Sequence, residues 1–122
     1  MNKFNITTVV REILSQDTNI RAMVGNSIFP LVAPIDTVGD LIIYQRDGYK
    51  QKYSQMGVTR QIPTVFINAV SDDYDRSQEL AGLIYEALEG DFSNPAMKIR
   101  LEDSTEEYAD KKYIQVLQFS IE

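Results

Sequence analysis

The sequence predicts an α+β domain in which a mixed or antiparallel sheet of about four to five strands is packed by two main helices. Three observations predict it. A stretch rich in β-branched residues opens at Pro63 and leads directly into a segment with apolar residues at helical spacing. A second helical pattern stands near the N-terminus. The C-terminal third alternates apolar and polar residues, as half-buried strands do. The predicted order of elements is α-α-β-β-α-β-β.

The strand and helix between Pro63 and Gly90 form the centre of this prediction. The strand PTVFINAV is followed by Ser71, which we expect to cap the helix N-terminus. Gly90 follows the last apolar residue of the helix, and a left-handed glycine there would end it. The apolar stripe of the helix comprises Leu80, Leu83, Ile84, Ala87 and Leu88. We expect it to pack on Val65, Ile67, Ile99, Leu117 and Phe119.

Two helices are predicted before the first strand. Asn5 is the expected N-cap of a helix whose apolar face consists of Ile6, Val9, Val10, Ile13 and Leu14. Asp17 should cap a second, short helix, which Gly25 closes. The segment SIFPLVAPI after it contains two prolines, and a proline cannot donate to a β-ladder. This segment is therefore an extended connector or an edge strand.

The remaining strands are predicted from composition and alternation. Residues 41–46 (LIIYQR) form a strand that is apolar on both faces at its start, and residues 91–96 (DFSNPA) have the composition of a turn. Residues 97–102 (MKIRLE) alternate strictly, with Met97, Ile99 and Leu101 inward. Residues 113–121 return as a strand with apolar residues on both faces. We expect both of its faces to be covered near Ile114 and Val116.

Residues 47–60 link two predicted strands and differ in character from both. The sequence DGYKQKYSQMGVTR is polar, is interrupted by two glycines, and carries three basic residues. It is either a solvated loop tip or an arm that contacts another protein, because long connections in compact domains are often functional. Tyrosine and methionine are enriched at interfaces, although cross-strand tyrosines also stabilise ordinary hairpins. The candidate contact residues are Tyr49, Lys50, Lys52, Tyr53, Met56 and Arg60.

Composition limits the classes of function. The 122 residues suffice for one domain, which we assign to residues 1–122. Histidine and cysteine are absent, so the commonest general base, the thiolate nucleophile and the commonest metal ligands are missing. The net charge of −6 disfavours binding to phosphate backbones. No apolar run has bilayer length and no signal peptide is recognisable. We expect a cytoplasmic, non-catalytic protein with no cofactor.

Acidic residues gather in two places. Asp72, Asp73 and Asp75 offer oxygen ligands for calcium or magnesium, but they lack the glycine and final glutamate of an EF-hand loop. Their position at a helix start makes capping and the helix dipole a sufficient explanation. The second group occupies a predicted hairpin tip, where water should leave its members ordinary acids. It comprises Glu102, Asp103, Glu106 and Glu107.

The aromatic and basic residues between Tyr44 and Arg60 also suit a surface for single-stranded nucleic acid. The acidity of the chain and the absence of a nucleic-acid motif argue against that interpretation. No serine lies in a GxSxG elbow, and the scattered glycines form no phosphate-binding loop. A contact surface for protein is the better interpretation.

The succession of segments resembles a known family. A short helix leads into IRAMVGNSIFPLVAP, then LIIYQR, then PTVFINAVSDDYDRSQELAGLIYEALEG, and finally a hairpin containing tyrosines. This order resembles the tail terminator, or tail-completion, proteins of long-tailed bacteriophages and prophages, over residues 20–121. The shared pattern is structural and none of it is catalytic. Ser77 stands where the helix pattern of the family begins with alanine, and residues 47–60 are more polar and charged.

The resemblance implies a homo-hexameric ring at the head-proximal end of the tail tube, a virion tail protein assembled in the host bacterial cytoplasm. The implied partners are further copies of the chain, the major tail tube protein and the head connector protein. DNA would pass through the ring without specific binding, and no membrane is involved. A ring needs two different patches that meet, which edge strands and a long hairpin can supply. The alternatives are a small cytoplasmic enzyme and a ligand-binding regulatory domain that use surface carboxylates.

Overall fold

A computed structural model describes residues 6–33, 39–54, 57–93, 96–109 and 111–121, with the backbone alone for residues 47–62 and 96. Within these ranges the elements are α1 (Ile6–Gln16), α2 (Thr18–Val24), β1 (Ile28–Pro30), β2 (Leu41–Ser54), β3 (Gly57–Ser71), α3 (Tyr74–Leu88), β4 (Gly90–Ser93), β5 (Ala96–Ala109) and β6 (Lys112–Ile121). The α+β prediction is confirmed, although the sheet has six strands instead of the expected four or five. None of the described helices is both long and apolar enough to cross a bilayer.

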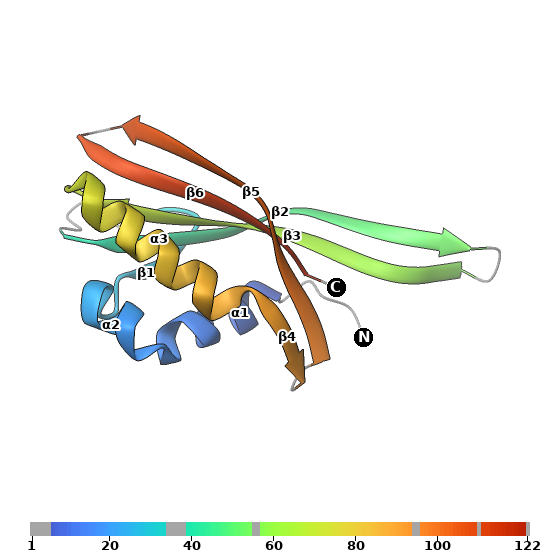
Figure 1. Cartoon of the computed structure of the whole chain (residues 1–122). Coiled ribbons are helices and arrows are strands. Elements are labelled where there is room, and N and C mark those ends of the chain that lie inside the picture. Colours follow the sequence, from blue (N-terminus) through green and yellow to red (C-terminus); the bar gives the residue numbers. More distant parts are fainter. Residues whose placement is uncertain (1–5, 34–38, 55–56, 94–95, 110, 122) are drawn as a thin grey trace.

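The strands form one mixed sheet in the order β1-β2-β3-β6-β5-β4. β1 runs parallel to β2, and every other neighbouring pair is antiparallel. Figure 1 shows the three helices together on one side of this sheet. β3 and β6 lie at its centre and pair over residues 64–71 and 113–120. The sheet therefore has one face under the helices and one face without a described helix.

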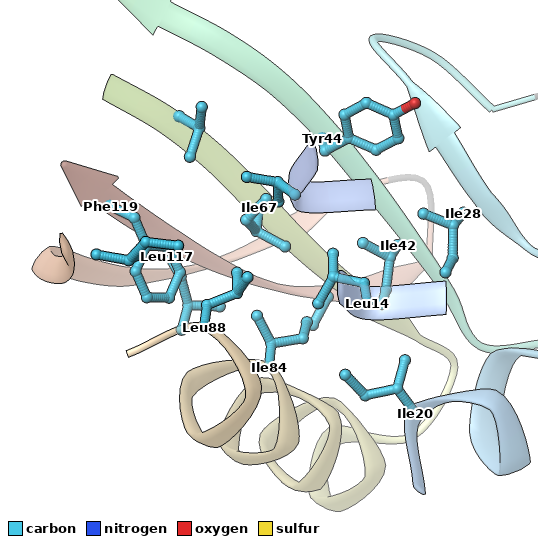
Figure 2. Packing of buried hydrophobic residues seen from close by; sticks show 14 of the residues in the cluster. Leu14, Ile20, Ile28, Ile42, Tyr44, Ile67, Ile84, Leu88, Leu117 and Phe119 are labelled. Atoms are coloured by element: carbon cyan, nitrogen blue, oxygen red, sulfur yellow. The ribbon is translucent and has the colours of Figure 1, made fainter. Parts of the chain in front are cut away.

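The core lies between α1, α3 and the central strands (Figure 2). Leu80, Ile84 and Leu88 of α3 are completely buried, while Leu83 and Ala87 are partly buried at the border of the same stripe. The predicted stripe is thus confirmed, and it packs in one cluster with sheet residues that include Ile67, Leu117 and Phe119. In α1 the buried residues are Ile6, Val10 and Leu14. The apolar pattern of the sequence accounts for both helices.

Two predictions about the edges of the sheet had different outcomes. The segment after α2 forms β1, which pairs only with β2, so the expectation of an edge strand is confirmed. The expected turn at residues 91–96 is wrong, because residues 90–93 form β4 and pair with residues 96–99. Phe92 packs partly buried against the core, which favours an extended chain there. Gly90 has φ of 142°, a region that favours glycine, but it starts β4 instead of taking a left-handed helical turn.

The caps of the helices were also only partly predicted. Asp17 caps α2, since its Oδ1 accepts the backbone N–H of Ile20 at 3.0 Å, and Gly25 closes this helix with φ of 59°. The N-cap of α3 is Asp73 and not Ser71. Ser71 is buried at the end of β3, where its hydroxyl donates to Asp40 at 2.6 Å. Asn5, the expected cap of α1, lies outside the described residues.

On the face of the sheet away from the helices, the predicted cover of β6 is not found in the described part of the chain. Ile114 and Val116 are half-buried, where we expected cover on both sides. Burial on this face is found instead at Leu41 and Val70, which pair with each other. Branched apolar residues suit a half-buried strand as well as a covered one, so sequence could not separate the two cases.

Candidate interaction surfaces

The β2–β3 hairpin continues past the rest of the sheet as a two-stranded ribbon (Figure 1). β6 pairs with β3 only over residues 64–71, and β1 pairs with β2 only over residues 42–44. The ribbon runs on to the pair formed by Ser54 and Gly57. Its β3 half, residues 57–63, spans roughly 20 Å at about 3.3 Å per residue. We call residues 47–62 the arm. The loop-tip interpretation is wrong, since most of this segment is paired strand.

The predicted contact residues fall on the arm. Tyr49, Lys50, Lys52 and Tyr53 belong to β2, and Arg60 of β3 pairs with Lys52. Met56 lies outside the described residues. The register shifts between Arg46 and Gly48 and again between Lys52 and Tyr53, and such bulges bend and twist a ribbon. By sequence the arm carries three basic residues and one acidic residue, in a chain with net charge −6. The contact role of these side chains stays a prediction.

A β-bulge in β5 creates a second surface that alternation did not predict. The pairing with β6 shifts between Leu101 and Asp103. Before the shift, Met97 and Ile99 are buried in the core; beyond it, the residues on that face are Ser104, Glu106 and Tyr108. Glu106 pairs with Gln115, and Tyr108 pairs with Tyr113. The acidic residues 102–107 therefore lie within a strand and not at a hairpin tip.

Three tyrosines and two glutamates meet at this end of the sheet, beside the N-terminus of α3. The Tyr113 ring lies 5.6 Å from the Tyr74 ring in an edge-to-face arrangement and 4.9 Å from the Tyr108 ring. Tyr108 remains 61% exposed and Tyr74 39%. Together they border a hollow of about 290 Å³, which we call the tyrosine cleft. Its lining consists of Tyr74, Glu106, Glu107, Tyr108, Tyr113 and Gln115.

Hydrogen bonds hold the floor of the tyrosine cleft. The buried amide of Gln115 donates through Nε2 to Glu106 Oε2 at 2.9 Å and to Ser77 Oγ at 3.3 Å. Ser77 in turn donates to the carbonyl oxygen of Tyr74 at 2.6 Å. The hydrogen bonds from Tyr74 and Gln115 lower the pKa of Glu106, and the contact with Glu106 raises the pKa of Tyr74. Glu106 is thus not the ordinary acid that we expected, and the cleft carries a fixed carboxylate.

The aspartates at the start of α3 have separate structural roles. Asp73 Oδ1 accepts the N–H of Asp75 at 3.0 Å, which is the capping that we expected. Asp72 does not cap the helix but forms an ion pair with Lys112 at 2.8 Å. Asp40 joins the start of β2 to this corner, because it accepts from Ser71 and, at 2.7 Å, from Arg76 Nε. Within the described ranges, no three acidic residues are grouped as a metal site would require.

The edge at β1 exposes a small apolar pair. Leu31 and Val32 follow Pro30 and are 65% and 75% exposed. Leu31 is held in place because its N–H donates to the carbonyl oxygen of Tyr44 at 2.9 Å. With Thr7 and Arg46 it borders a second shallow hollow at the base of the arm. This pair adds an apolar element to the surface near the arm.

Comparison with known proteins gives a structural likeness. No protein-family model matches the chain, and no curated protein matches it. A solved chain from the structure described as "Virion of native gene transfer agent (GTA) particle" has the same fold, with a TM-score of 0.77. The match covers 92% of this chain and 89% of that chain at 16% sequence identity. At this identity the likeness establishes the fold.

Proposed function

We propose that this protein is a structural, non-enzymatic component of a phage-like virion, and specifically a tail terminator. Copies of the chain would form a ring, which we take to be a hexamer, that caps the tail tube and meets the head connector. The fold shared with a gene transfer agent virion chain, over 92% of this protein, supports the class. The order of sequence segments, which resembles that of tail terminators, supports the particular role.

The observation that carries the proposal is the placement of two unlike surfaces at opposite ends of β3. The arm extends beyond Thr64, whereas the tyrosine cleft lies where Ser71 pairs with Tyr113. A closed ring needs such a pair of different patches, one from each neighbour. In the described backbone the two strands of the arm pair only with each other, so both outer edges of the ribbon are open to a partner.

The charge of the chain suits a ring through which DNA passes. Eighteen acidic residues against twelve basic ones give a surplus of negative charge. A protein that gripped the duplex would need basic residues to neutralise phosphates. An acidic lumen lets DNA pass without specific binding, and the basic arm then meets acidic protein surface, either on a neighbour or on the tube.

The test is assembly on tail tubes with a charge reversal in the arm. Lys50→Glu with Lys52→Glu should abolish or strongly reduce capping, measured by electron microscopy of tube lengths and ends, while circular dichroism shows an unchanged fold. Lys98→Glu is the control, because Lys98 is an exposed lysine on β5, outside the arm. Normal capping by the folded double variant would rule out the electrostatic role of the arm. Unfolding of that variant would show that the arm belongs to the core.

A further inference from the structure

We propose that the tyrosine cleft is a receptor for a basic side chain, supplied by the arm of a second copy of this chain. The inference rests on the proposed function only in requiring that copies associate. It adds which two surfaces meet and by what chemistry.

The lining of the cleft selects a cation. Aromatic rings within about 6 Å of a lysine or arginine group attract it through their negative faces. The Tyr113 ring contacts both other rings, with centroids 5.6 Å from Tyr74 and 4.9 Å from Tyr108. Glu106 and Glu107 border the same hollow. The carboxylates would repel an anion, and an apolar ligand would displace water from the charged Glu106 without replacing its hydration. A hollow of about 290 Å³ accommodates one ammonium or guanidinium group with its stem.

The cleft is held in shape before any ligand arrives. Gln115 fixes Glu106 by a hydrogen bond of 2.9 Å and is itself buried between β6 and α3. The nearby Lys112 is engaged by Asp72 at 2.8 Å on the start of α3. A pre-organised site loses less conformational freedom on binding than a mobile one. Holding the carboxylate beside the rings therefore favours capture of a basic side chain from outside.

The arm concentrates positive charge, with three of the twelve basic residues of the chain in sixteen positions, and it cannot reach its own cleft. Lys50, Lys52 and Arg60 lie on a ribbon that starts beyond residue 64 of β3, while the cleft lies at residue 71. The intervening strand spans roughly 23 Å at about 3.3 Å per residue, and the arm continues away from it (Figure 1). Only a second copy can bring its arm to the cleft. Repetition of that contact joins copies head to tail.

The experiment measures self-association by sedimentation equilibrium and uses three matched variants. The cleft variant carries Tyr108→Ser and Glu106→Gln, because both side chains are on the helix side of β5. The arm variant carries Lys50→Ala, Lys52→Ala and Arg60→Ala. The control carries Tyr85→Ser and Glu86→Gln, the same residue types exposed side by side on α3. The cleft and arm variants should each weaken self-association at least about tenfold, and the control should leave it unchanged. Higher salt should weaken the wild-type association as well.

Mixing the two defective variants gives the decisive result. Each retains the surface that the other lacks, so an equimolar mixture should form a heterodimer of two 13.9 kDa chains although neither variant associates alone. A mixture that stays monomeric, or a cleft variant that associates like wild type, would overturn the proposal. Should Tyr108→Ser disturb folding, Glu106→Gln alone replaces the cleft variant, because Glu106 is exposed and lies on the cleft face of β5.

The same variants separate this inference from the proposed function. A wild-type chain that is monomeric at every concentration, or a cleft variant that associates normally but fails on tail tubes, would overturn the second-copy contact. In the latter case tube capping by the wild type would still stand, and the cleft would take a basic side chain from the tube. If neither the wild type nor any variant caps tail tubes, but the mixture still forms the heterodimer, the tail terminator role is overturned. The contact between arm and cleft then still stands.

Discussion

The protein has two long hairpins, β2–β3 and β5–β6, and only the second is attached to a helix at its outer end. In both, strands run past their outer neighbours: β2 and β3 continue beyond β1 and β6, and β5 continues beyond β4. The β5–β6 end is fastened to α3 by Gln115, Ser77 and the contact between the Tyr74 and Tyr113 rings. The arm extends where Figure 1 shows no helix. A hairpin under a helix becomes a fixed receptor surface, whereas one beyond the helices becomes a projecting element.

The largest expected effect tests whether stability resides under α3 and not in the arm. Ile84→Ala should lower the free energy of unfolding by about 2–5 kcal/mol, because Ile84 is completely buried and its truncation leaves a cavity. Urea denaturation measures the change. Tyr85→Ala, on the exposed side of the same helix, should stay within about 0.5 kcal/mol.

A shortened arm completes this experiment. Lys50 and Ile62 form a register pair, so an Asn-Gly turn can replace the residues between them. This variant should keep the denaturation midpoint close to that of the parent chain. A loss as large as that of Ile84→Ala would show that the arm packs on the core, and the contrast between the two hairpins would fail.

The next largest effect on stability tests the hydrogen bonds that attach the β5–β6 end to α3. Gln115→Ala removes the buried amide that joins Ser77 and Glu106, and should cost about 1–3 kcal/mol. Gln118→Ala is the control, because Gln118 lies on the same strand but on the face without a described helix. Equal costs for the two variants in chemical denaturation would mean that Gln115 does not fasten this end.

The smallest effect concerns the charge of the tyrosine cleft. Hydrogen bonds lower the pKa of Glu106 in the folded protein, so they stabilise its ionised form. This contribution is fully present above the ordinary glutamate pKa of about 4.3 and is lost as pH falls through the folded-state pKa. NMR titration should find the pKa of Glu106 below the ordinary glutamate value, and Tyr74→Phe should raise it. An unchanged pKa in that variant would exclude the Tyr74 hydroxyl as the cause.

Much of the fold was predictable because its signals are local and periodic. The stripe around Ile84, the cap at Asp17 and the edge position of β1 each follow from a few neighbouring residues. The cap of α3 was misplaced because Ser71, Asp72 and Asp73 are all good cap residues, and only the pairing of β3 shows where the strand ends.

The tyrosine cleft was not predictable from alternation. One extra residue between Leu101 and Asp103 reverses which side chains of β5 face the helices. Without it, Thr105 and not Glu106 would pair with Gln115. The only signal in the sequence was the concentration of tyrosines at the two ends of one hairpin, at Tyr108 and Tyr113. The polarity and length of residues 47–60 were enough to locate the arm. Its partner could not be predicted, because binding to another protein leaves no periodic pattern in the sequence.

The central position of β6 also has a consequence for how the protein folds. β3 pairs with β6, so the β1-β2-β3 part of the sheet cannot pair with the rest until residues 113–120 have been synthesised. During synthesis β2 and β3 can form a hairpin early, because their contacts are local. The inner edge of β3, with the apolar sequence TVFINAV, then stays open, and such a segment is prone to aggregate. Arg60, four residues before this segment, and Lys52, its register partner on β2, add charge beyond one end of it, and charge beside an open strand disfavours pairing with other chains. The residues that we propose for assembly would thus also protect the chain before its sheet is complete.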